Sequence, residues 1–78
     1  MMYDAEEWPY CVLGQVRVVV TGLRVRTQPD AAGEIIGSWR EDQILDLWCK
    51  LGDWWLVQDN SLPDGLTGWS HRMYLVDA

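Results

Sequence analysis

Phenylalanine is absent from this sequence, and basic residues are scarce. The chain has 78 residues, with six lysines and arginines against twelve aspartates and glutamates, so its formal net charge is −6. A negative field of this kind repels phosphate backbones and anionic lipids. The composition therefore argues against direct binding to nucleic acid and against binding to a membrane surface.

A basic N-terminus and a long apolar run are also missing. Residues 1–7 are acidic where a secretory signal needs positive charge followed by an apolar stretch. No segment has the length and hydrophobicity of a transmembrane helix. We therefore expect a cytoplasmic location; an extracytoplasmic location would follow if a native leader were missing from the sequence.

Cysteine and histidine are too few for the common catalytic and metal-binding motifs. Cys11 and Cys49 are the two cysteines, and without an export signal they are expected to be free thiols. With His71 they show neither the paired-cysteine nor the paired-histidine spacing of zinc sites. Ser70 and His71 are neighbours, and adjacent strand residues point apart, so they are no nucleophile and base. We expect no catalytic residue, no metal, no cofactor and no enzymatic activity.

Tryptophan, in contrast, is abundant. Six tryptophans in a chain that is 49% hydrophobic can supply a packed core, which argues against disorder. The most informative stretch is Gly52-Asp53-Trp54-Trp55-Leu56-Val57, where a tight turn leads into an apolar strand. Because side chains alternate across a strand, Trp54 and Trp55 are expected on opposite faces.

Short apolar segments separated by turn residues make up most of the chain. Strands are expected at residues 15–20, resuming at 23–26 after an interruption at Thr21-Gly22, and then at 34–39, 43–50, 54–58, 67–70 and 74–76. This spacing is typical of an all-β protein, and at this length only a small barrel fits. We predict a barrel of five to six short antiparallel strands over residues 15–78.

Residues 1–14 are expected to form an N-terminal arm. Pro9 excludes a regular helix or a central strand there. Trp8, Tyr10, Val12 and Leu13 would be costly to leave in water, so the arm should pack on the barrel or on a partner.

Strand alternation also predicts which side chains face the core. In the strand at residues 43–50, Leu45 and Leu47 share one face, and Ile44, Asp46 and Trp48 share the other. The expected core residues are Trp39, Trp69, Val18, Val20, Leu23, Val25, Ile36, Leu45, Leu47 and Val57.

Taken in order, these segments resemble the bacterial Src-homology-3 (SH3b) family. The matching stretches are Leu23-Arg24-Val25-Arg26 with Pro29, Glu34-Ile35-Ile36-Gly37, Leu45 to Leu47, Gly52 to Val57, and Thr67-Gly68-Trp69 followed by Tyr74-Leu75. The resemblance covers residues 18–76 and implies an SH3-like barrel. Bacterial members are often attached to cell-wall hydrolases and are taken to hold them on peptidoglycan or its peptide bridges.

The resemblance extends to the peptide groove of eukaryotic Src-homology-3 domains. It implies that Trp54 and Tyr74 lie side by side, between the proline loop and a short turn at His71-Arg72-Met73. His71 stands where that groove has a proline, and the acidic-aromatic motif of the groove is absent, which argues against recognition of proline-rich peptides. Asp42 stands where the family has a glycine after the hairpin.

Two further tryptophans are candidates for an interface. Trp48 and Trp55 fall outside the inward register set by Leu45, Leu47 and Leu56 or Val57, and neighbouring exposed tryptophans would form an apolar patch. Either the N-terminal arm covers this patch or a second subunit or partner does. The predicted partner-binding residues are therefore Trp48, Trp54, Trp55, His71, Arg72 and Tyr74.

These observations predict a non-catalytic binding module of bacterial or phage origin. It would recognise a peptide, glycan or protein partner through its aromatic surface, by shape and stacking. The alternative is a self-assembling or inhibitory protein, which could be encoded by a phage. It would engage another protein, or a second copy of itself, through exposed tryptophans and its acidic surface. The acidic residues are dispersed along the sequence, which is the pattern expected of a surface that only keeps the protein soluble.

Overall fold

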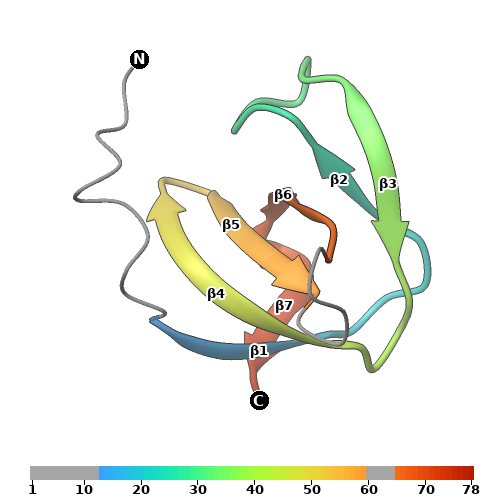
Figure 1. The fold of residues 1–78 in the computed structure, drawn as a ribbon, viewed down its shortest axis with the longest axis vertical. Coiled ribbons are helices and arrows are strands. Elements are labelled where there is room, and N and C mark those ends of the chain that lie inside the picture. Colours follow the sequence, from blue (N-terminus) through green and yellow to red (C-terminus); the bar gives the residue numbers. More distant parts are fainter. Residues whose placement is uncertain (1–12, 60–64) are drawn as a thin grey trace.

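One antiparallel β-sheet curls into a small barrel in the computed structural model, which describes residues 13–59 and 65–78 (Figure 1). The elements are β1 (Gly14–Val18), β2 (Leu23–Arg26), β3 (Ile35–Trp39), β4 (Ile44–Leu51), β5 (Trp54–Asp59), β6 (Thr67–His71), the 3-10 turn η1 (Arg72–Tyr74) and β7 (Leu75–Asp77). The strand order across the sheet is β3-β2-β6-β5-β4-β1-β7. The predicted all-β, SH3-like barrel is confirmed.

The described residues contain seven strands rather than the five or six expected. The difference arises partly at Gly22, whose φ of 77° lies in the left-handed region that glycine adopts freely. Its N–H donates to the carbonyl of Trp39 at 3.0 Å. The chain changes direction there, so β1 pairs with β4 and β7, whereas β2 pairs with β3 and β6.

Most of the predicted core residues are buried. Val20 is half-buried and packs against the core, and Ile36 is wrong, because 40% of its surface is exposed. The prediction missed Val16, Leu56 and Leu75, which are also buried. The residues predicted as core and found buried are Val18, Leu23, Val25, Trp39, Leu45, Leu47, Val57 and Trp69.

The prediction of Ile36 as core did not follow strand alternation, because counting back from the buried Trp39 puts Gly37 on the inner face and Ile36 on the outer face. Val25 of β2 faces Gly37 of β3, but the next residue, Arg26, faces Ile35, so Ile36 is the extra residue of the pair. A bulge disturbs the strict alternation of side chains along a strand. The bulge accounts instead for Ile35, which alternation alone would turn inward and which is 43% exposed.

Trp54 and Trp55 lie on opposite faces of β5, as predicted. Trp54 is directly opposite His71, and Trp55 is directly opposite Ser70. Ser70 is completely buried, and Trp55 packs against the core cluster. Trp55 is therefore on the inner face, and Trp54 is on the outer face.

Residues 1–12, which make up most of the predicted arm, and residues 60–64 lie outside the described residues. At the arm's end, the N–H of Leu13 donates to the carbonyl of Leu47 at 2.7 Å, and Gly14 already begins β1. A search of residues 13–59 and 65–78 finds no helix with the length and hydrophobicity needed to cross a membrane.

Candidate ligand-binding groove

A groove of about 250 Å³ lies where β2, the start of β5 and the end of β6 meet η1. Its lining combines aromatic rings, aliphatic side chains and two arginines, and it includes no carboxylate. The lining residues are Leu23, Arg24, Arg26, Trp54, His71, Met73 and Tyr74. We call this feature the groove.

Three aromatic rings form a continuous surface in the groove. The ring centroids of Trp54 and His71 are 5.2 Å apart, with planes at 74°, which is an edge-to-face contact. The centroids of His71 and Tyr74 are 6.1 Å apart, with planes at 57°. Trp54 and His71 meet because they are directly opposite each other on β5 and β6. Trp54 and Tyr74 therefore line the same groove, as predicted, with the His71 ring between them.

His71 is held in place by the backbone that follows it. Its Nδ1 accepts a hydrogen bond of 3.1 Å from the N–H of Met73, so His71 caps the N-terminus of η1. In the neutral ring that accepts this bond, Nε2 carries the proton. The same cap fixes the turn that carries Met73 and Tyr74 into the groove.

An ion pair fastens η1 to the turn before Trp54. Nε of Arg72 lies 2.8 Å from Oδ1 of Asp53, and the N–H of Arg72 donates to the carbonyl of Asp53 at 2.9 Å. The hydrogen bond and the charge of Arg72 lower the pKa of the Asp53 carboxyl. Arg72, a predicted partner-binding residue, therefore lies beside the groove with its charge already paired.

Arg24 and Arg26 are groove residues that the sequence analysis missed. Nη1 of Arg26 donates to the carbonyl of Gly33 at 2.9 Å, which anchors its guanidinium. The backbone carbonyl of Arg24 accepts a hydrogen bond of 2.8 Å from Ser70 Oγ. The signal was present in the alternation of Leu23-Arg24-Val25-Arg26, which sends both arginines to the face opposite the core.

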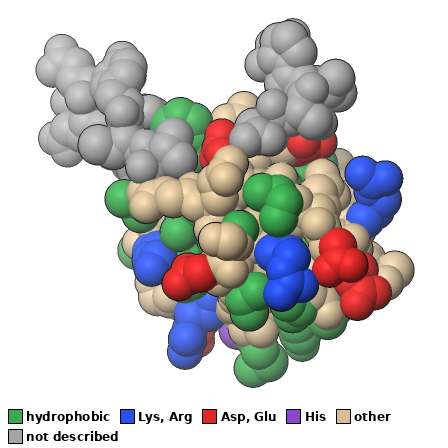
Figure 2. Space-filling model, turned by 90° about the horizontal axis from the view of Figure 1, so that it is seen from below, with side chains coloured by type: hydrophobic (Ala, Val, Ile, Leu, Met, Phe, Trp, Pro, Cys, Tyr) green, Lys and Arg blue, Asp and Glu red, His purple; other side chains and the backbone are tan. Residues whose placement is uncertain are grey.

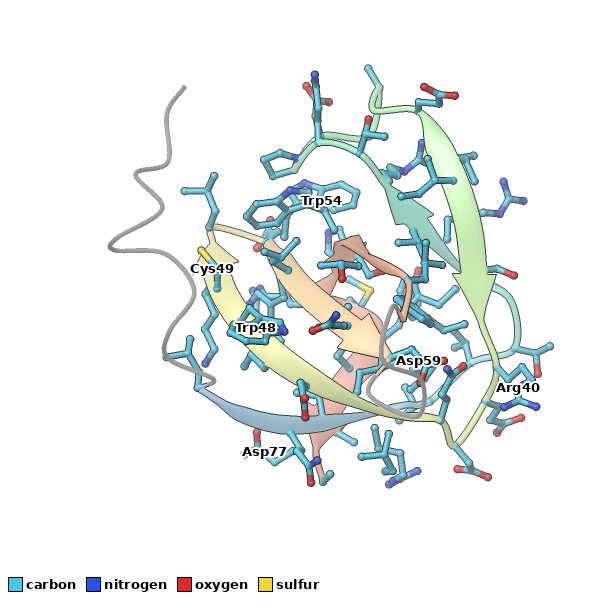
Figure 3. All side chains as sticks on the ribbon, in the orientation of Figure 1. Arg40, Trp48, Cys49, Trp54, Asp59 and Asp77 are labelled. Carbon is cyan, nitrogen blue, oxygen red and sulfur yellow. The ribbon has the colours of Figure 1, made fainter. Side chains whose placement is uncertain are left out.

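Trp48 does not line the groove. The pairing of β4 with β5 shifts between Leu47 and Cys49, so Trp48 sits at a bulge. Its Nε1 donates to Oε1 of Gln58 at 2.9 Å. Figure 3 shows Trp48 over β4, apart from Trp54 at the start of β5.

Trp55 is likewise absent from the groove, and the predicted outward patch of Trp48 and Trp55 is wrong. Val57, rather than Leu56, belongs to the central core cluster, and two-residue alternation then brings Trp55 to the same inner face. The ammonium of Lys50 lies 4.5 Å from the centroid of the Trp55 ring, which is a cation–π contact.

Cys49 and Ser70 are two side chains outside the groove that could act as nucleophiles. Cys49 is a free thiol, as predicted, and burial raises its pKa, which lowers the fraction of reactive thiolate. The Ser70 hydroxyl is buried and hydrogen-bonded to both the Trp39 indole and the Arg24 carbonyl. Across the two described ranges, no three histidine, cysteine or acidic side chains gather as metal ligands would.

Comparison with known proteins supports the family assignment. The family model of the bacterial SH3 domain matches residues 21–76, well over half of the chain. No curated protein and no solved structure gives a match. Domains of this family generally serve as binding modules. The match runs from β2 into β7 and includes every residue of the groove, and the chain therefore belongs to the bacterial SH3 domain family.

Proposed function

We propose that the chain is a non-catalytic binding module that holds a peptide segment of a partner protein in the groove. The observation that carries the proposal is the continuous aromatic surface of Trp54, His71 and Tyr74 beside an open groove. Aromatic side chains provide a large contact area with few rotatable bonds, so little entropy is lost when a ligand covers them.

Met73, which also lines the groove, favours a peptide ligand. Met73 is 67% exposed and contributes a thioether, whereas Leu23 belongs to the core and is only 7% exposed. Thioether and aliphatic surface suits the apolar side chains of a peptide, and methionine adapts to ligands of different shape.

Two contacts hold η1 against the elements that line the groove. The cap at His71 and the Asp53–Arg72 ion pair fix η1 at both β6 and the β4–β5 turn. A preformed site avoids the entropic cost of ordering loops on binding. This rigidity supports a binding role for the groove.

Replacing Trp54 tests the proposal. The probes are peptides selected from a random display library against the full chain, and binding is measured by titration calorimetry. Trp54→Ala should abolish binding without unfolding the protein, because Trp54 is half-buried and lies outside the core cluster. Trp48→Ala is the matched control and should leave the affinity unchanged. Selected peptides that bind a folded Trp54→Ala variant with unaltered affinity would contradict the proposal.

Self-association is the second candidate function, and strand β3 favours it. In the described residues, β3 lies at one end of the strand order and exposes Ile35 and Ile36 by 43% and 40%. An exposed apolar edge strand can pair with another chain. Light scattering behind a sizing column decides between the two: a mass near 9.0 kDa over a range of concentrations excludes self-assembly, and a stable multiple supports it.

A further inference from the structure

The groove has a local charge opposite to that of the whole chain. The chain has a net charge of −6, yet the groove is lined by Arg24 and Arg26 and by no carboxylate. On the face shown in Figure 2, in contrast, acidic and basic side chains are interspersed. A positive groove on a negative protein attracts an anionic group to one place and repels it elsewhere.

Arg24 is available to a ligand. Its side chain is exposed, and within the described part of the chain its guanidinium has no ion-pair or hydrogen-bond partner. Its backbone, however, is fixed by the buried Ser70 hydroxyl. The Arg24 guanidinium therefore lines the groove while its backbone is held by a hydrogen bond.

Arg26 complements Arg24 from two residues along the same face of β2. Its guanidinium is half-buried and oriented by the Gly33 carbonyl, through Nη1 alone. The remaining N–H groups of this planar fork are suited to the two oxygens of a carboxylate. An oriented guanidinium loses less entropy on binding than a freely rotating lysine.

We propose that the groove binds an acidic peptide, with an aspartate or glutamate side chain of the peptide on Arg24 and Arg26 and a neighbouring apolar side chain on the rings of Trp54 and Tyr74. This inference rests on the proposed function and specifies its ligand. A single carboxylate matches the two arginines, whereas a polyanion such as nucleic acid would meet the negative charge of the rest of the chain.

A double-mutant cycle tests the inference. Terminally blocked peptides from the display selection are synthesised in pairs that differ only by glutamate or glutamine at the acidic position. The glutamate peptide should bind the wild-type chain about tenfold more tightly or better, as charge-assisted hydrogen bonds do. Arg24→Gln should remove that preference and leave the affinity for the glutamine peptide nearly unchanged.

Arg40→Gln is the matched control. It removes the same charge from an arginine outside the groove lining, which Figure 3 shows far from Trp54, and it should preserve the preference for glutamate. Equal affinity of the two peptides for the wild-type chain, or an equal effect of Arg24→Gln on both, would overturn the inference while leaving peptide binding established. Failure of the library to yield any peptide sensitive to Trp54→Ala would overturn the proposed function as well.

Discussion

The indole nitrogen of Trp39 donates a 3.0 Å hydrogen bond to the hydroxyl of Ser70, and that hydroxyl donates in turn to the carbonyl of Arg24 at 2.8 Å. Trp39 and Ser70 are buried, at 2% and 0% exposure. The two bonds connect β3, β6 and β2 behind the groove. They satisfy the polar atoms of a buried tryptophan and fix the backbone that carries Arg24.

Loss of this hydroxyl should destabilise the barrel. Ser70→Ala leaves the Trp39 N–H and the Arg24 carbonyl without their partner, which should lower the free energy of unfolding by about 1–3 kcal/mol. Thr67→Ala in the same strand is the control, because Thr67 is exposed and should change stability by less than about 0.5 kcal/mol. Urea denaturation measures both. Equal stability of the two variants would show that the buried hydrogen bonds contribute little.

Gly68 and Gly37 should differ in their tolerance of alanine. A Cβ at Gly68 would lie 2.4 Å from Cγ1 of Val25 and 2.9 Å from the carbonyl oxygen of Arg26, so backbone would have to move. A Cβ at Gly37 would instead meet the end of the flexible Leu66 side chain at 2.7 Å. Gly68→Ala should cost about 1–3 kcal/mol by overpacking, and Gly37→Ala should cost less. Thermal unfolding of the two variants measures both losses of stability. A larger loss for Gly37→Ala than for Gly68→Ala would contradict the prediction.

Asp42 should be replaceable by glycine but not by alanine. Its φ of 70° is left-handed, a conformation that costs a residue with a Cβ about 1–2 kcal/mol. Its carboxylate pairs with Arg17 at 3.1 Å on the exposed surface, where such pairs contribute about 0–1 kcal/mol. Asp42→Gly should therefore leave stability almost unchanged, whereas Asp42→Ala should be less stable than the glycine variant by about 1 kcal/mol or more. Chemical denaturation of both variants measures the difference, and equal stabilities would contradict it.

The Asp53–Arg72 ion pair should weaken only in acid. The folded protein holds the pKa of Asp53 below its ordinary value of 3.8, so the contribution of this carboxylate is present above that pH. It is lost as the pH falls through the lowered pKa of the folded state. An NMR titration of the carboxyl carbon should show this low midpoint, and Arg72→Gln should move the midpoint up towards 3.8. An unchanged midpoint in that variant would remove Arg72 as the cause.

The strands were predictable because turn residues and two-residue alternation are local features of the sequence. Leu23–Arg26 was placed with its observed bounds, and Leu45 and Leu47 were assigned to the correct face. The error at Ile36 could have been avoided by alternation from Trp39, whereas the bulges at Ile36 and Trp48 could not be predicted, because an extra residue is invisible to a count along one strand.

The groove was only partly predictable. Resemblance to a known fold brought Trp54 and Tyr74 together, but the contribution of Arg24 and Arg26 depends on β2 pairing with β6, far along the chain. Such non-local pairing is not encoded in any single segment. The cytoplasmic location, the arm over residues 1–14 and the bacterial or phage origin stay predictions.

The two faces of β5 give adjacent tryptophans different sensitivities as fluorescent probes. Trp55 is packed against the core, so its emission should change when the barrel unfolds. Trp54 borders the groove in contact with His71, so a bound molecule would change its surroundings while the core stays intact. Because the chain has six tryptophans, variants that each lack one of these two would separate the ligand response of Trp54 from the unfolding response of Trp55.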